Sequence, residues 1–292
     1  MTGRWLVTGA GGMVAGDLLR LLGDRGVGLD RRALDICQAD QVEQVIGDHR
    51  PEVVVNCAAW TAVDDAELHE EQARAVNADG VRHLAEACSR TGSRLIHLST
   101  DYVFPGDATS PYAEDAPTGP RSAYGRTKLA GEQAVLEVLP GTGYVVRTAW
   151  LYGTTGRDFV RTMMKLESER EYLDVVYDQV GQPTWSADLA ALLVRLGESG
   201  AEPGIYHGTS SGQCSWHALA SEVFRLLGAD PSRVRPVGSA AFPRPAPRPA
   251  YSVLGHARWA GTGVAPIGDW NEALSRAFPE VRRSLYNAAH AS

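Results

Sequence analysis

The chain has 292 residues, of which 44% are hydrophobic and 22% are charged, with a formal net charge of -7 and a pI near 5.6. This composition is typical of a globular protein with one or two domains and argues against disorder. The net negative charge argues against the basic surface that nucleic-acid binding requires, so we expect a small molecule as the partner.

The sequence predicts neither a metal site nor a membrane segment. The four cysteines, Cys37, Cys57, Cys88 and Cys214, show no CxxC pair and no zinc-ligand spacing, and the histidines do not cluster. The first residues lead into a strand without the basic head and apolar run of a signal peptide, and no apolar window is long enough to span a bilayer. We therefore expect buried thiols and a cytoplasmic location.

Short apolar runs alternate with helical patterns through the first half of the chain. The runs are WLVTGA, EVVVNCAA, RLIHLST and GYVVRTAWLYG. Continuous β-branched strands with helices between them are typical of a parallel sheet that is covered on both faces. We predict an α/β fold, with a Rossmann-type doubly wound parallel sheet over residues 1–155.

The second half has a looser pattern, with four helical segments separated by Gly and Pro stretches. These segments are RDFVRTMMKLESERE, SADLAALLVRLGES, SWHALASEVFRLLGA and DWNEALSRAF, and the biased segment PRPAPRPA is expected to be extended. We predict a smaller, mainly helical, substrate-binding domain over residues 156–292. A part of it, at about 175–200, is expected to return to the Rossmann domain.

A glycine-rich turn follows the first strand. In TGAGGMVAG, Gly9, Gly12 and Ala15 lie three residues apart as a helix begins. Such a turn lets backbone N–H groups and a helix N-terminus approach a pyrophosphate closely. A structural glycine turn is common, but its place between a strand and an amphipathic helix favours dinucleotide binding.

The residues between the glycine-rich turn and the EVVVNCAA run leave the choice of dinucleotide open. Asp30 lies 18 residues after Gly12, about where an acid holds the adenosine ribose hydroxyls. Arg31 and Arg32 follow it and are suited to a 2'-phosphate, so the local residues favour NAD and NADP at once. A third interpretation is that these three residues form a solvated charged loop without a ligand.

Three polar side chains are predicted to meet at one edge of the sheet. Ser99, Thr100 and Asp101 end the RLIHLST strand, where ligands of open α/β sheets bind, although such residues also cap turns. In SAYGRTKLAGE, Tyr124 and Lys128 are four residues apart on one helical face, a spacing that also arises by chance. We predict that Thr100, Tyr124 and Lys128 converge above a nicotinamide.

Motifs along nearly the whole chain together resemble the extended short-chain dehydrogenase/reductase superfamily, and within it the dTDP-4-dehydrorhamnose reductase family. These motifs are TGAGGMVAG, NCAAWTAVDDAE, AVNADG, LSTDYVFPG, YGRTKLAGE, RTAWLYG, QVGQPTWSADLA, GIYHGTSSGQCSWHALA and PRPAPRPAYSVL. The resemblance implies NADPH as cofactor, with NADH as the alternative, and reduction of the C4 ketone of a dTDP-linked 4-keto-6-deoxyhexose. It leaves a homodimer and the identity of the deoxysugar open.

The resemblance also implies roles for the three polar residues. Tyr124 is expected to protonate the developing alkoxide as a general acid. Lys128 is expected to lower the pKa of Tyr124 and to bind the nicotinamide ribose. Thr100 is expected to donate a hydrogen bond to the substrate carbonyl.

The binding residues implied by the resemblance fall into two groups. Those expected along the cofactor are Gly9, Gly11, Gly12, Met13, Val14, Asp30, Arg31, Asp35, Ile36, Ala58, Ala59, Thr61, Asn77, Ser99, Tyr124 and Lys128. Those expected at the sugar nucleotide are Val63, Thr100, Asp101, Tyr102, Trp150, Arg244 and Arg248. Core packing remains the alternative for Trp150, and a solvated Pro-rich connector remains the alternative for the two arginines.

Three other functions are weighed against ketone reduction. Sugar-nucleotide dehydratases of the superfamily carry a glutamate after the strand threonine, where this chain has Asp101 and then Tyr102. Epimerases keep a similar Tyr and Lys, and DQVGQPT and PRPAPRPAYS are the motifs that favour a reductase over them. A regulatory subunit like that of methionine adenosyltransferase would not need the three catalytic residues, so their presence favours an enzyme.

Overall fold

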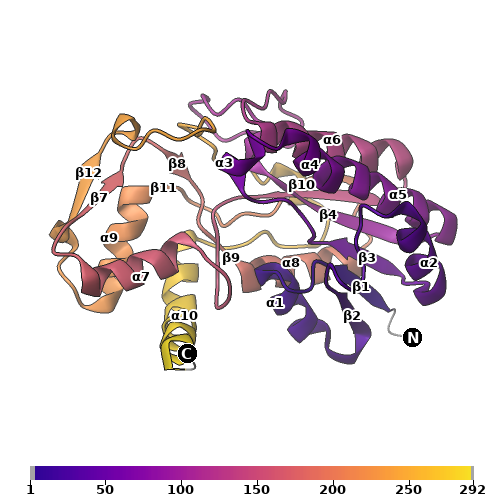
Figure 1. The fold of residues 1–292 in the computed structure, drawn as a ribbon, viewed down its shortest axis with the longest axis horizontal. Helices are drawn as coiled ribbons and strands as arrows, with labels where there is room; N and C mark the ends of the chain where they lie inside the picture. Colours follow the sequence, from indigo (N-terminus) through magenta and orange to yellow (C-terminus); the bar gives the residue numbers. More distant parts are fainter. Residues whose placement is uncertain (1–3, 291–292) are drawn as a thin grey trace.

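A six-stranded parallel sheet forms the centre of the structure, a computed structural model that describes residues 4–290 (Figure 1). Its order is β10-β5-β4-β3-β1-β2. The strands are β1 (Trp5–Thr8), β2 (Gly26–Leu29), β3 (Val53–Asn56), β4 (Arg94–Thr100), β5 (Gly143–Thr148) and β10 (Gly204–His207). The order winds outward in both directions from β1 and β3, and ligands of open sheets bind at such a reversal.

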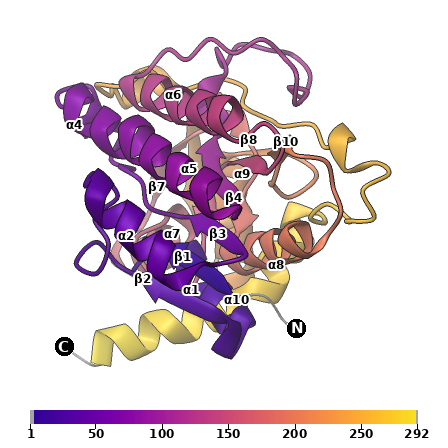
Figure 2. The same cartoon turned by 90° about the vertical axis from the view of Figure 1, so that its right-hand side faces the viewer.

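Helices cover both faces of this sheet, as Figure 2 shows. One face carries α1 (Met13–Leu22) and α8 (Ser186–Glu198), and the other carries α2 (Ala39–His49), α5 (Gly80–Thr91) and α6 (Ala123–Val138). Successive residues of a strand enter opposite layers, so Val54 packs with α2, α5 and α6, whereas Val55 packs with α1 and α8. The predicted doubly wound α/β fold is confirmed.

The helical segment that follows β3 is interrupted by an irregular turn. The helix α4 (Glu70–Arg74) continues through a π-helical turn, η2 (Ala75–Asp79), into α5. Within the turn, the Asn77 side chain accepts from the Trp60 backbone N–H at 2.8 Å and donates to the hydroxyl of Thr127 at 3.1 Å. The irregular turn therefore ties the loop after β3 to α6.

The rest of the chain forms a second layer of helices and short strands beside the sheet (Figure 1). Its helices are α7 (Phe159–Glu169), α9 (Trp216–Leu227) and α10 (Trp270–His290). Its strands pair as β7 (Leu173–Val176) with β12 (Val234–Val237), β8 (Val180–Gly181) with β11 (Cys214–Ser215), and β6 (Leu151–Tyr152) with β9 (Thr184–Trp185). The short helix α3 (Val63–Ala66) precedes α4. Five 3-10 turns lie at Gly23–Arg25, Asp101–Val103, Pro231–Arg233, Ser239–Ala241 and Ala257–Trp259.

Several elements lie outside the sequence prediction. The strands β2 and β10 flank the sheet, and neither was expected from the apolar runs, because β2 is GVGL and β10 is GIYH. Both β10 and α8 come after residue 155 and pack with the first half of the chain, and α8 lies within the segment at about 175–200 that was expected to return to the Rossmann domain. The division of the chain at residue 155 stays a prediction. No helix in the described range, residues 4–290, has the length and apolar character to cross a membrane.

A buried ion pair joins α6 to β5. Arg147 donates from Nε and Nη2 to the two carboxylate oxygens of Glu132, at 2.8 and 2.7 Å, and their side chains are 2% and 1% exposed. Arg147 also donates from Nη1 to the Glu114 carbonyl at 3.2 Å, and its guanidinium lies 4.8 Å from the Phe104 ring centre. Removal of one partner would leave the other charge buried without compensation.

Arg147→Met is therefore expected to lower the free energy of unfolding by about 3–5 kcal/mol, measured by chemical denaturation. Arg82→Met is the matched control, because Arg82 pairs with Glu137 at 2.7 Å on the surface. Exposed pairs contribute little, so the control should unfold almost as the wild type does. Equal effects of the two substitutions would contradict a structural role for the buried pair.

Candidate active site

The glycine-rich turn after β1 leaves room and donors for an anion. Gly9 has φ of 65°, and a Cβ there would lie 2.7 Å from the backbone nitrogen of Ala58. A Cβ at Gly11 would meet nothing within 4 Å. The N-cap of α1 is Gly12, which supplies no side-chain cap, so the first N–H groups of this helix stay available to a ligand. These features fit the pyrophosphate of a dinucleotide.

A cleft of about 400 Å³ opens beside this turn, within the range of small-molecule sites. Ten of the predicted cofactor residues line it: Gly9, Gly11, Gly12, Asp30, Arg31, Asp35, Ile36, Ala58, Ala59 and Thr61. The sequence missed four further lining residues, Leu34, Cys57, Trp60 and Val76. Their apolar character gave no separate signal, because buried strand ends and helices carry the same residue types.

Six predicted cofactor residues do not line this cleft: Met13, Val14, Asn77, Ser99, Tyr124 and Lys128. The last three lie at the end of β4 and on α6 and are described below. Met13 packs against Gly153, and Val14 is buried in the core under α8. Asn77 is fully buried, with its amide bonded to Trp60 and Thr127. The structure therefore places Asn77 as a support for the cleft loop, and its contact with a cofactor stays a prediction.

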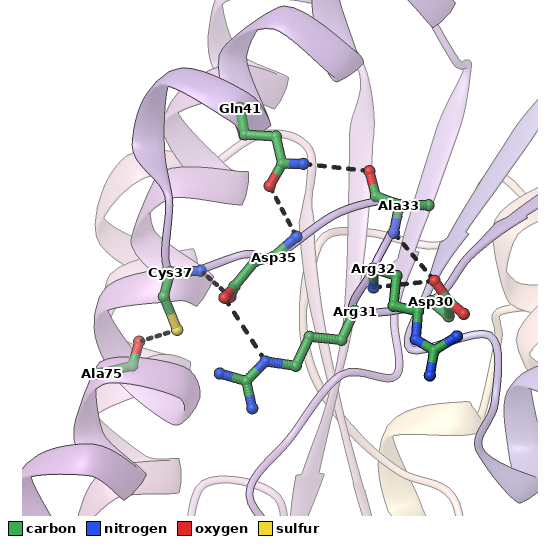
Figure 3. Close-up of polar contacts among 8 residues, drawn as sticks. All are labelled: Asp30, Arg31, Arg32, Ala33, Asp35, Cys37, Gln41 and Ala75. Atoms are coloured by element: carbon green, nitrogen blue, oxygen red, sulfur yellow. Dashed lines mark hydrogen bonds and ion pairs between the residues drawn. The ribbon is translucent and has the colours of Figure 1, made fainter.

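The loop after β2 holds an acid and an arginine at the rim of the cleft (Figure 3). One carboxylate oxygen of Asp30 accepts from the backbone N–H groups of Arg32 and Ala33, both at 3.0 Å. Arg31 is 81% exposed, and its Nε lies 3.6 Å from a carboxylate oxygen of Asp35. The backbone of the loop therefore holds the Asp30 carboxylate in place, whereas Arg31 would lose only one weak ion pair on binding a ligand.

Helix α6 places Tyr124 and Lys128 over the end of β4. The helix begins after Ser122, whose hydroxyl accepts from the Gly125 N–H at 3.1 Å. Lys128 is buried, and its Nζ donates to the Leu98 carbonyl at 2.6 Å. Tyr124 is partly buried, with its ring packed at 5.7 Å against the ring of Tyr102.

Burial moves the pKa values of Tyr124 and Lys128 apart, upward for the phenol and downward for the ammonium. Burial raises the pKa of Tyr124 to about 12, with an opposing effect of the Thr100 hydroxyl and a smaller upward effect of Asp101. Burial also lowers the pKa of Lys128 to about 8, although Glu132 opposes it. The expected lowering of the Tyr124 pKa is therefore wrong for the groups of this chain, because loss of solvation outweighs every nearby charge.

The Thr100 hydroxyl donates a hydrogen bond to the neighbouring Asp101 carboxylate. Its Oγ1 donates to a carboxylate oxygen of Asp101 at 3.0 Å and accepts from the Tyr102 N–H at 3.2 Å. Asp101 is buried, and burial raises its pKa to about 6, while the hydroxyls of Ser252 and Thr100 oppose the shift. To donate to a substrate carbonyl, the Thr100 hydroxyl has to rotate away from Asp101. Ser99, one residue earlier, is buried as well.

A second pocket, of about 670 Å³, lies between Tyr102 and the helical layer. Its lining residues are Tyr102, Trp150, Phe159, Thr162, Met163, Leu166, Asp174, Val175, Val176, Gln179, Trp216, Phe242, Arg244, Arg248 and Pro249. Four of these, Tyr102, Trp150, Arg244 and Arg248, are predicted substrate residues. The sequence missed the apolar wall from α7 and β7, because a helix face packed on a core has the same pattern.

Trp150 both packs against another ring and lines the second pocket, and its contact with a substrate stays a prediction. Its ring stacks on Trp216 at 3.4 Å between centres, and it also lines the second pocket. Its φ of 47° is unusual for a bulky residue, and such strain persists only where the surroundings enforce it. The stacked rings of Trp150 and Trp216 therefore form a fixed aromatic wall of the second pocket.

The two arginines of the Pro-rich segment differ. Arg244 is exposed at the pocket, whereas Arg248 donates to the Asp64 carboxylate at 2.8 Å. Asp64 also accepts from the Ala246 N–H at 3.2 Å, so α3 anchors this segment. Val63, the residue before Asp64, begins α3 and does not line the second pocket.

Within residues 4–290, no group of three or more His, Cys, Asp or Glu side chains is arranged to hold a metal ion. The four cysteines are free thiols.

Curated proteins similar to this chain cover almost its whole length. The family model described as RmlD substrate binding domain matches residues 3–283. A Streptomyces antibioticus protein named probable dTDP-4,6-dihydroxy-2-methyloxan-3-one 4-ketoreductase is 57% identical over 284 residues, which cover 95% of each chain. A Streptomyces griseus protein named dTDP-4-dehydrorhamnose reductase is 56% identical over 285 residues, 95% of this chain and 94% of its own.

Solved structures show the same fold. The crystal structure of dTDP-4-dehydrorhamnose reductase from Bacillus anthracis in complex with NADP has a TM-score of 0.92 and 38% identity, over 96% of this chain and all of the other. The fold and the site define a Rossmann-type α/β protein with a Tyr-x-x-x-Lys pair at the edge of its sheet. The chain belongs to the RmlD substrate binding domain family, and its resemblance to the dTDP-4-dehydrorhamnose reductases is confirmed.

The Lys128 pKa can be measured directly, because Lys128 and Lys165 are the two lysines of the chain. In protein labelled with ¹³C at lysine Cε, we expect one signal to titrate near pH 8, with the ammonium present below that pH and lost above it. Lys165→Arg removes the other signal and so assigns the first. A Lys128 signal that titrates only near the ordinary value of about 10.4 would contradict the effect of burial.

Proposed function

We propose that this protein reduces the C4 ketone of a dTDP-4-keto-6-deoxyhexose with a nicotinamide cofactor. The proposal rests on the position of Tyr124 and Lys128, one helical turn apart on α6, beside the end of β4 that carries Leu98 and Thr100. Cys57 beside Lys128 lines the dinucleotide-sized cleft, and Tyr102, which packs on Tyr124, lines the second pocket. Relatives that are 56–57% identical carry the names of dTDP-4-keto sugar reductases. NADPH is the proposed cofactor and NADH the alternative, and the NADP complex of the Bacillus anthracis protein supports this choice.

The side chains of this protein then have distinct tasks. When bound, the dihydronicotinamide supplies the hydride. Tyr124, which burial keeps protonated through neutral pH, gives its proton to the developing alkoxide. Lys128 places positive charge beside the reacting oxygen, and Thr100 stabilises that oxygen once its hydroxyl turns from Asp101.

The second pocket suits a sugar nucleotide. Its aromatic wall at Trp150 and Trp216 offers a flat surface to a ring, and apolar groups such as Met163 lie beside it. Arg244 and Arg248 border the same pocket, and the guanidinium fork matches a diphosphate. We propose that Arg248 exchanges its ion pair with Asp64 for the diphosphate when the substrate binds. A homodimer and a cytoplasmic location stay predictions.

Incubation of the full chain with NADPH and either dTDP-4-keto-rhamnose or its unepimerised precursor tests the function. We expect NADPH oxidation with at least one of the two, and NMR of the product to show a new hydroxyl at C4. The stereochemistry of that product decides between dTDP-L-rhamnose and another antibiotic-type deoxysugar. Isomerisation without net oxidation would instead indicate an epimerase, and binding without turnover would indicate a regulatory protein.

Tyr124→Phe is expected to lower kcat by about 100-fold or more, because it removes the proton donor. The Kd for NADPH should change little, since the ring that packs against Tyr102 is kept. Tyr172→Phe makes the same chemical change at an exposed position and serves as the matched control. Wild-type turnover in Tyr124→Phe would remove Tyr124 from the mechanism.

Arg31→Ala is expected to weaken NADPH binding by about tenfold and to leave NADH binding nearly unchanged, since a charged contact with the 2'-phosphate is lost. Arg32→Ala is the control, because Arg32 is a neighbouring exposed arginine that does not line the cleft. The ratio of kcat/KM for the two cofactors measures the effect. An equal loss with both cofactors would show that Arg31 does not read the 2'-phosphate.

A further inference from the structure

A row of buried polar side chains crosses the sheet beneath the candidate active site. Thr8, Asn56 and His97 occupy the same register on β1, β3 and β4, on the face covered by α2, α5 and α6. All three are at most 1% exposed. Polar groups in such an interior are costly without partners, so the directions of their hydrogen bonds are strongly constrained. In the sequence, His97 lies within the apolar run RLIHLST, a position that is typical of a core residue.

A backbone donor fixes the orientation of the Asn56 amide. The N–H of Ala58 donates to Asn56 Oδ1 at 3.1 Å, and the Thr8 hydroxyl donates to the same oxygen at 2.6 Å. The amide nitrogen Nδ2 therefore faces His97, 3.0 Å from its Nδ1. An amide NH₂ only donates, so Nδ1 of His97 has to accept.

His97 is consequently a neutral imidazole with its proton on Nε2. Burial, and to a lesser extent the charge of Lys128, hold the pKa of His97 well below its ordinary value. The protonated Nε2 lies 3.4 Å from Lys128 Nζ. An ammonium group is also a pure donor, so the two groups can share a hydrogen bond only when Lys128 is a neutral amine.

We propose that His97, locked as the Nε2–H tautomer by Asn56, is a positioning residue that keeps Lys128 on the Leu98 carbonyl and favours release of its proton. The other groups around Lys128 act differently. Glu132 of α6 favours the ammonium but is held by Arg147, and the Cys57 thiol after β3 has a smaller effect in the same direction. Glu132 and Cys57 therefore do not oppose the ammonium; burial opposes it, and the Nε2–H of His97 adds to this opposition.

The inference rests on the proposed function for its role in turnover. After Tyr124 has protonated the alkoxide, its phenolate needs a proton before the next cycle. An O–H bond forms on Tyr124 as an N–H bond breaks on Lys128, and the resulting amine regains a proton from solvent. A Lys128 that releases its proton readily makes this return faster at neutral pH.

The tautomer itself is tested first, in the wild-type chain and without any turnover. A ¹H–¹⁵N NMR spectrum of the histidine rings should show His97 protonated on Nε2 and unprotonated on Nδ1 from about pH 6 to 9. His97→Gln identifies the signal by its disappearance. A proton on Nδ1 would overturn the proposal, whatever the activity.

The variant Asn56→Asp is expected to switch His97 to the other tautomer. A carboxylate accepts from Nδ1–H, which leaves Nε2 free to accept from the Lys128 ammonium. We expect the Lys128 titration, followed by its ¹³Cε signal, to move up by about one pH unit or more. In the full enzyme, kcat at neutral pH should fall while the KM for NADPH stays within about twofold of the wild-type value. An unchanged titration would overturn the proposal.

Two further variants separate the tautomer from other effects. Thr8→Val removes one member of the row but keeps the Ala58 donor, so the Lys128 titration should stay as in the wild type. Asn56→Asp combined with His97→Leu keeps the new carboxylate but removes the ring, so the upward shift should disappear. A shift that persists without the ring would overturn the proposal in favour of direct charge attraction. Absence of ketone reduction with the predicted tautomer would refute the proposed function alone.

Discussion

The close approach of α6 to the elements below it determines the geometry of the whole site. A Cβ at Gly125 would overlap the Tyr102 carbonyl oxygen, and one at Gly131 would overlap the Asn77 carbonyl oxygen. Only glycine at these two positions lets the helix lie directly on the 3-10 turn at Asp101–Val103 and on η2. Tyr124 and Lys128 lie on the same stretch of helix, so this contact brings them to the end of β4.

The same contact explains the electrostatics of the site. Burial penalises the charged form of every group, so the pKa of Tyr124 rises to about 12, that of Lys128 falls to about 8, and that of Asp101 rises to about 6. A tyrosine in this environment stays a proton donor, and a lysine gives up its proton more easily. In the proposed mechanism Tyr124 is the proton donor and Lys128 returns its proton, while Asp101 fixes the direction of the Thr100 hydroxyl.

Local sequence predicted much of this arrangement. The β-branched runs, the glycine turn and the Tyr-x-x-x-Lys pair each follow from short-range spacing, and ten predicted cofactor residues do line one cleft. The role of His97 was not visible, because it depends on Asn56 of another strand, and strand register is a tertiary property. The Arg248 pair with Asp64 and the strained Trp150 likewise depend on contacts between segments far apart in the chain.

Hydride transfer with deuterium-labelled cofactor tests the central claim most directly. NADPH that carries deuterium at the transferable C4 position would be incubated with the 4-keto-6-deoxyhexose nucleotide, and the product examined by NMR. The account predicts one deuterium at C4 of the sugar, and one labelled cofactor oxidised for each sugar reduced. Product without deuterium at C4, or label retained on the cofactor after turnover, would contradict ketone reduction at the site formed by Thr100, Tyr124 and Lys128.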